Sequence, residues 1–140
     1  MIRLLCVFAA CLNVLAASPE LLRLRQPLHF EKLRDGHFRA QSPGYSLDLS
    51  PGAARISTAE ASAAIRFINA TGPVRVEPEE PLPGIVNHLT GPDPAQWRTG
   101  IATFGRVRLV EVYPGIDVIF YGNGLELEYD IIVAPGVSAD

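Results

Sequence analysis

The chain has 140 residues, of which 48% are hydrophobic and 19% are charged, and its formal net charge is -3. This length accommodates one folded domain rather than two. The acidic balance argues against a nucleic-acid partner or a polybasic membrane anchor, because both need clustered Lys and Arg. Twelve glycines and twelve prolines interrupt the sequence, which favours short strands and many turns over long helices.

The N-terminus has the order of features that is typical of a secretory signal peptide. A positive charge at Arg3 precedes an apolar run that ends in small residues near Ala17. The run is too short to span a bilayer, which needs about 20 residues. We therefore expect residues 1–17 to form a signal-peptide helix that is removed on export, and residues 18–140 to form one domain of a secreted, periplasmic or cell-surface protein. A buried N-terminal helix is the alternative interpretation.

Both cysteines of the chain, Cys6 and Cys11, lie inside this segment. Residues 8–11 weakly resemble a lipoprotein box, so lipidation of Cys11 is a second alternative. Removal of the segment would leave a domain without disulfides, thiolate metal ligands or a cysteine nucleophile. The stability of that domain would depend on its hydrophobic core.

The first half of the domain predicts several short strands. Tyr45–Ser50 alternates apolar and polar residues, which is the period-two pattern of a half-buried strand. Shorter extended pieces are expected at Leu28–Glu31 and His37–Ala40. A turn with glycine at positive φ is expected at Pro51-Gly52.

Residues 57–69 support two interpretations. Ser57-Thr58-Ala59-Glu60 has the pattern of a helix capping box, and the alanines around it favour a helix. Ile65-Arg66-Phe67-Ile68 is instead rich in residue types that favour a strand. The local sequence does not decide between the two.

The middle of the chain is rich in proline. Residues 73–94 contain six of the twelve prolines, which excludes a long helix there. We expect one short strand at Ile85–Leu89 and a single helical turn that Asp93 caps and that ends near Trp97. The three glutamates within residues 77–80 are expected to be solvated.

Residues 101–133 carry the clearest pattern. Thr103–Val112 is expected to be extended and, because neither of its faces is purely apolar, to contain a bulge or to lie at an edge. Ile116–Tyr121 is a nearly continuous apolar strand, and every second residue from Leu125 to Val133 is apolar. The Gly122-Asn123-Gly124 connection predicts a hairpin. These patterns predict a mostly β fold, an antiparallel β-sandwich-like domain.

Five stretches of the sequence occur in a recognisable order. They are Leu82–His88, Gly91–Thr99, Val112–Gly122, Leu127–Asp130 and Val133–Gly136. Together they resemble the N-terminal β-rich domain of bacterial SBBP (β-propeller repeat) cell-surface proteins, over roughly residues 28–140. The resemblance favours a strand at residues 63–69 and implies no catalytic residues, since that domain has no established activity. Such proteins continue into propeller repeats, so we expect this chain to be an incomplete N-terminal part of a longer protein.

Acidic residues on the last predicted strand are the first candidates for chemistry. Glu126, Glu128 and Asp130 alternate along it, and Asp117 lies across the expected hairpin. Several carboxylates that point toward one another can bind Ca²⁺. A pair of carboxyl groups at a suitable separation can instead catalyse the hydrolysis of a glycoside. The alternative is a solvated face whose acids pair with arginines of the 103–112 strand.

Aromatic residues are the second group of candidates. Trp97, Tyr113, Tyr121 and Tyr129 would form a sugar-stacking platform if they came together, whereas aromatics at strand spacing also belong to a core or its rim. The histidines have no metal-ligand spacing, and no nucleophile elbow, phosphate-binding loop or dinucleotide motif is present. No catalytic, cofactor-binding or metal-binding residue is therefore assigned.

Two functions follow as expectations. The first is a non-catalytic structural or adhesion module of a secreted or cell-surface β-propeller-repeat protein, without a transmembrane span in the exported domain. The second is a carbohydrate-binding module or a fragment of a carbohydrate-active enzyme. In either case the ligand would be a surface glycan or a protein. The candidate ligand or ion surface consists of Trp97, Asp117, Tyr121, Glu126, Glu128 and Asp130.

Overall fold

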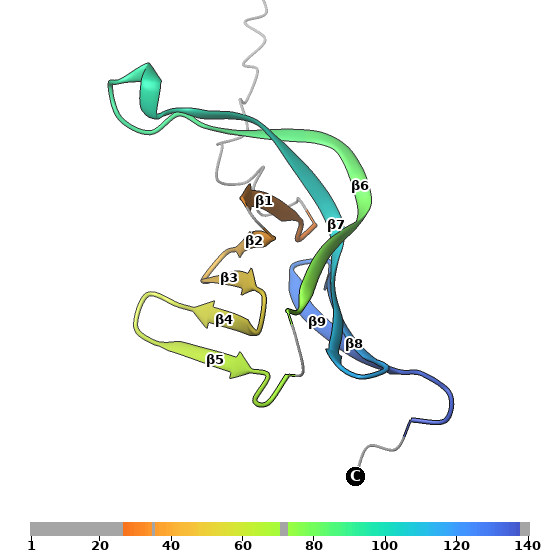
Figure 1. Ribbon diagram of the computed structural model, residues 1–140. Coiled ribbons are helices and arrows are strands. Elements are labelled where there is room, and N and C mark those ends of the chain that lie inside the picture. The colour runs from red at the N-terminus through yellow and green to blue at the C-terminus, as the bar shows by residue number, and fades with distance from the viewer. Residues whose placement is uncertain (1–26, 35, 71–72, 138–140) are drawn as a thin grey trace, which may run out of the picture.

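The computed structural model describes residues 27–34, 36–70 and 73–137. The expected signal peptide at residues 1–17 lies outside these residues. The described part forms one antiparallel sheet of nine strands and a single 3₁₀ turn (Figure 1). The elements are β1 (Phe30–Arg34), β2 (His37–Ser42), β3 (Tyr45–Ser50), β4 (Ala53–Ser57), β5 (Ser62–Arg66), β6 (Arg75–His88), η1 (Pro94–Gln96), β7 (Arg98–Tyr113), β8 (Ile116–Asn123) and β9 (Glu126–Val133).

The sheet curls on itself. Its strand order is β5-β4-β3-β2-β1-β7-β8-β9, with β6 on the other side of β7. β1 joins the β1–β5 meander to the rest of the sheet through only two residue pairs with β7, Phe30 with Phe104 and Glu31 with Thr103. At the turns, the Ser42 and Tyr45 hydroxyls each donate a 2.9 Å hydrogen bond to the carbonyl of Leu125. The meander therefore faces β7, β8 and β9 across a shared interior.

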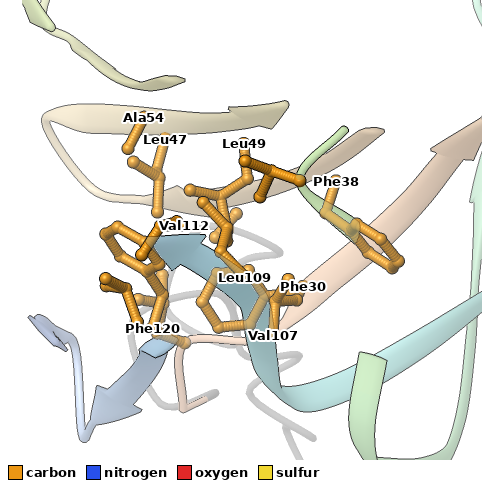
Figure 2. Close-up of a cluster of buried hydrophobic side chains, with 13 residues drawn as sticks. Phe30, Phe38, Leu47, Leu49, Ala54, Val107, Leu109, Val112 and Phe120 are labelled. Atoms are coloured by element: carbon orange, nitrogen blue, oxygen red, sulfur yellow. The ribbon is translucent and has the colours of Figure 1, made fainter. Parts of the chain in front are cut away.

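This interior is a single hydrophobic core. Figure 2 shows side chains of the first four strands pointing toward those of β7 and β8. The fully buried large side chains are Phe30, Phe38, Leu47, Leu49, Val107, Leu109, Val112 and Phe120. Each such side chain contributes about 1.5–3 kcal/mol by leaving water. The prediction of a mostly β, antiparallel fold is confirmed, with two halves of one curled sheet taking the place of two separate sheets.

The first five strands confirm the alternating pattern of the sequence. Leu47 and Leu49 of β3 are buried, and Gly52 in the following turn has φ 108°. In the ambiguous segment 57–69 the strand interpretation is confirmed over Ser62–Arg66, and the helix is wrong. The Thr58 hydroxyl accepts hydrogen bonds from the amides of residues 60 and 61, so the apparent capping box closes the β4–β5 turn.

The prediction for residues 73–94 is wrong in one respect. β6 is a 14-residue strand, Arg75–His88, that runs through Pro78, Pro81 and Pro83. Proline lacks the amide hydrogen of a ladder, but it is tolerated where one side of a strand is free, and β6 pairs only with β7 in the described residues. The pairing shifts register between Pro81 and Ile85, which accommodates the prolines.

Residues 85–100 leave the body of the protein as a two-stranded arm (Figure 1). The tip is the expected turn, since Asp93 caps η1 by accepting a hydrogen bond from the Ala95 amide. On its way out, the arm is held by a 2.6 Å contact between His88 Nε2 and the buried Glu31 carboxylate. The Thr103 hydroxyl also donates a 2.7 Å hydrogen bond to the Gly84 carbonyl.

The C-terminal hairpin is confirmed. β8 and β9 pair without interruption from Ile116 with Val133 to Asn123 with Glu126, and Gly124 in the turn has φ 64°. The bulge expected within 103–112 is present as well, because Glu111 has φ 53° and the β7–β8 register shifts there. None of the helices in the described residues has the length and apolar character needed to cross a membrane.

Candidate functional site

An open groove of about 450 Å³ lies where the segment of residues 27–29, just before β1, meets β6, β7 and β8. Its walls are mostly apolar, with Leu82, Pro83 and Ile85 on the β6 side. Five residues with polar side chains also line it, His29, Glu80, Thr103, Arg106 and Tyr121. An apolar groove with a few convergent polar groups is the usual form of a ligand site.

Among these polar side chains, Arg106 contacts both Glu80 and Tyr121. Arg106 Nε lies 3.0 Å from Glu80 Oε1, and its guanidinium carbon lies 5.5 Å from the centre of the Tyr121 ring. Glu80 adopts a left-handed backbone conformation, φ 54°, which costs of order 1–3 kcal/mol for a residue with a side chain. The Glu80 side chain crosses β7 at Gly105, where an added Cβ would lie 2.8 Å from Glu80 Oε2. A glycine at position 105 therefore allows this ion pair to form.

An acidic row on β9 adjoins the groove through Tyr121. The Tyr121 hydroxyl donates a 3.3 Å hydrogen bond to Asp130, and the Asn123 amide donates a 2.9 Å hydrogen bond to Glu128. Glu126 is exposed at the hairpin end and pairs with Asn123 in the ladder. The structure thus brings together four of the six candidate residues, Tyr121, Glu126, Glu128 and Asp130.

Asp117 is engaged elsewhere. One oxygen accepts a 2.8 Å hydrogen bond from the Glu111 amide, and the other lies 3.2 Å from Arg108. Arg108 also contacts Glu79 on β6. Asp117 therefore holds the β7 bulge in place and links it to β6. In the described residues, no three His, Cys, Asp or Glu side chains come together in an arrangement that could hold a metal ion.

The aromatic candidates occupy different parts of the molecule. Trp97 lies at the arm tip, where its indole nitrogen donates a 3.1 Å hydrogen bond to the Gly91 carbonyl. Tyr129 packs against Phe120 with ring centres 5.8 Å apart, on the face of the sheet opposite to Tyr121. Tyr113 donates to the Ile68 carbonyl. Of these aromatics, only Tyr121 lines the groove.

The environment of Tyr121 favours its neutral form. Loss of contact with water raises the pKa of its phenol above the ordinary value of 10.0, and the nearby carboxylates of Glu128 and Asp130 raise the pKa further. The folded protein therefore stabilises the protonated phenol. This contribution to stability is complete below the pKa of an unfolded tyrosine and is lost as pH rises through the folded pKa.

We expect the tyrosinate absorbance of the folded protein to include one group that titrates above pH 10. Subtracting the titration of the Tyr121→Phe variant isolates this group from the other three tyrosines. Asp130→Asn is expected to lower its midpoint, because one repelling carboxylate is gone. A Tyr121 midpoint at or below 10 would contradict the described geometry.

Comparison with known proteins places the chain in a family. Residues 29–140 match the family described as "Domain of unknown function (DUF7948)". The chain belongs to the DUF7948 family. No curated protein and no solved structure matches the chain. The match covers every described strand of the DUF7948 domain and all of the residues that line its groove except Pro27 and Leu28.

Sequence reasoning missed Glu80 and Arg106 as groove residues of the DUF7948 domain. Glu80 belongs to a run of acids that was expected to be solvated, and Arg106 was expected only to neutralise acids of a neighbouring strand. Their contact depends on the β6–β7 register, in which Glu79 faces Arg106. The one available signal was Gly105 next to Arg106, since a glycine inside a strand indicates close approach by another group.

Proposed function

We propose that this DUF7948 domain is a non-catalytic module that acts outside the cytoplasm by contacting another polypeptide, as a structural or adhesion element. The N-terminal sequence supports export, because its charge, apolar run and small residues follow the order of a secretory signal. The observation that carries the proposal is the arm of residues 85–100. Neither the core nor the groove accounts for its length.

The arm exposes large apolar side chains to water, which is unfavourable unless a partner covers them. Leu89 is 59% exposed and Trp97 is 39% exposed, and neither lines the groove. A two-stranded ribbon is marginally stable by itself in water, and exposed apolar patches mark sites of protein interaction. The charged groups at the groove are paired with each other, as in Glu80 with Arg106, which supports a binding role over a catalytic one.

We further propose that the domain stands at the N-terminus of bacterial SBBP (β-propeller repeat) cell-surface proteins. The support is the order of the motifs Leu82–His88, Gly91–Thr99 and Val112–Gly122. The first two form the outgoing strand and tip of the arm, and the third forms the bulge, turn and β8. In such a protein the arm would reach a neighbouring domain or subunit.

Site-specific photocrosslinking in the producing cell tests the contact. A photoreactive amino acid at position 89 of the arm is expected to give a discrete crosslink to a second polypeptide or to a distant part of the same chain. The same group at position 59, which is exposed on the β4–β5 turn, is the matched control. Equal crosslinking at both positions, or none from the arm, would reject the interaction module.

Carbohydrate binding is the second candidate, and the groove favours it. Tyr121 offers an aromatic ring beside the guanidinium of Arg106 and the carboxylate of Glu80, a combination that suits sugar rings and hydroxyls. A glycan array on the folded domain is expected to show binding that Tyr121→Ala removes and that Trp97→Ala, an aromatic change outside the groove, leaves intact. The absence of saturable binding by a folded sample excludes this candidate.

A further inference from the structure

β9 (Glu126–Val133) is the last strand on its side of the sheet in the described residues. One edge pairs with β8 along its whole length, and no strand in the described part of the chain pairs with the other edge. The strand contains no proline, no lysine and no break in register. Proteins block pairing at sheet edges with proline, bulges and charged side chains, lysine above all. β9 carries only acidic charge, so its edge is open to a further strand of opposite charge.

The inward face of β9 extends the hydrophobic core beyond what the meander covers. In the ladder, Tyr129 lies beside Phe120 and Ile131 beside Val118. Phe120 and Val118 are 2% and 3% exposed, whereas Tyr129 and Ile131 are 52% and 62% exposed. A strand added next to β9 would place its own inward side chains in the same layer and remove this apolar surface from water.

The outward face of β9 is acidic and has no cationic partner among the residues that the structure describes. Glu126, Glu128 and Asp130 alternate along it, and β9 itself contains no Lys or Arg. Glu128 and Asp130 accept hydrogen bonds only from the neutral groups of Asn123 and Tyr121. Arg106 and Arg108 of β7 are already paired with acids of β6 and β8, and Arg98, at the far end of β7, donates to the Leu33 carbonyl. This face therefore complements basic side chains on an adjacent strand.

We propose that the free edge of β9 accepts an extended polypeptide segment in which apolar and basic residues alternate. Its backbone would continue the ladder, its apolar side chains would cover Tyr129 and Ile131, and its Lys or Arg side chains would lie beside Glu128 and Asp130. Strand addition of this kind takes its affinity from the main chain and its specificity from alternate side chains. A second copy of β9 fits less well, because its acidic row would lie along this one.

Direct binding of a defined peptide tests this assignment. The probe is a nine-residue peptide of alternating valine and lysine with blocked ends, and its partner with glutamate in place of lysine is the control. The folded protein is expected to bind the lysine peptide about tenfold more tightly, since opposite charges lie across the new pair. Added salt should weaken the binding. The surface is separate from the arm, so this result is independent of the crosslinking result above.

Two variants locate the site. Ile131→Lys places a charge on the exposed inward face and is expected to abolish binding, whereas Ile65→Lys on the opposite edge strand β5 leaves it unchanged. Asp130→Lys is expected to shift the preference toward the glutamate peptide. If Ile131→Lys does not fold, this change in preference alone tests whether the peptide binds beside β9. Equal affinity for both peptides, binding that survives these changes, or no binding would overturn the proposal. Dimerisation that Ile131→Lys abolishes would overturn it in favour of a second copy.

Discussion

Phe30→Ala is expected to lower the free energy of unfolding by about 3–5 kcal/mol, the usual cost of removing a fully buried phenylalanine. Phe30 is 0% exposed and lies in β1. Its backbone forms one of the two pairs that connect the meander to β7. The cavity would open between the two halves of the sheet, which in the described residues are paired only through β1 and β7. Small domains have only about 5–15 kcal/mol in total, so this loss is a large fraction of the stability.

Urea unfolding followed by circular dichroism measures this loss. Ile68→Ala is the matched control, because Ile68 is 72% exposed and surface substitutions usually change stability by less than about 0.5 kcal/mol. A Phe30→Ala protein as stable as the Ile68→Ala protein would show that the halves do not share the core described above.

Gly122→Ala is expected to destabilise the protein by about 1–3 kcal/mol or more, the cost of overpacking. A Cβ at this position would lie 2.7 Å from the Cβ of Leu28 and 2.8 Å from the Leu28 carbonyl oxygen. These atoms belong to the backbone of Leu28 or are attached directly to it, so they cannot move aside as the end of a flexible side chain can. The Leu28 amide donates a 2.7 Å hydrogen bond to the Gly124 carbonyl, so the displaced segment would also lose its link to the β8–β9 turn.

Gly84→Ala supplies the contrast. The nearest atom to its added Cβ is the Thr103 hydroxyl oxygen at 3.9 Å, an ordinary contact, so the substitution is expected to be neutral or to stabilise by up to about 1 kcal/mol through the unfolded state. Thermal melting compares the two variants, and hydrogen exchange at the Leu28 amide reports whether its bond to Gly124 opens. Similar melting temperatures for both variants would contradict the close approach at Gly122.

Local patterns predicted the elements whose signals lie within a few residues. The β8–β9 hairpin followed from period-two alternation around Gly122-Asn123-Gly124, and η1 followed from Asp93 with Pro94. The long β6 was missed because each proline argues against a strand unless one edge is known to be free. The local sequence also left open whether Thr58 begins a helix or a turn. Its hydroxyl accepts the same type of hydrogen bond from a backbone amide in both structures.

The candidate site divides in the same way. Glu126, Glu128 and Asp130 were expected on one face of the last strand, with Asp117 across the hairpin, and Tyr121 was a candidate only as an aromatic residue. The structure places Tyr121 beside Asp130. Glu80 was not added to them, because the pairing of β6 with β7 and a positive φ position its carboxylate on Arg106. Asp117 and Trp97 were candidates because the site also contains acidic and aromatic residues. In the structure, Asp117 accepts a hydrogen bond from the Glu111 amide at the bulge, and Trp97 donates one to the Gly91 carbonyl.

The sequence by itself determined the β class, several of the turns and the two faces of strands such as β3 and β9, because the alternation of side chains between two faces is a local property of an extended chain. Only the tertiary structure decided which strands meet, how the sheet curls and where the groove, the arm and the open edge lie. These depend on contacts such as that of Ser42 with Leu125, 83 positions apart in the chain. Such distant contacts form when the whole core is buried at once, and no short stretch of residues specifies them.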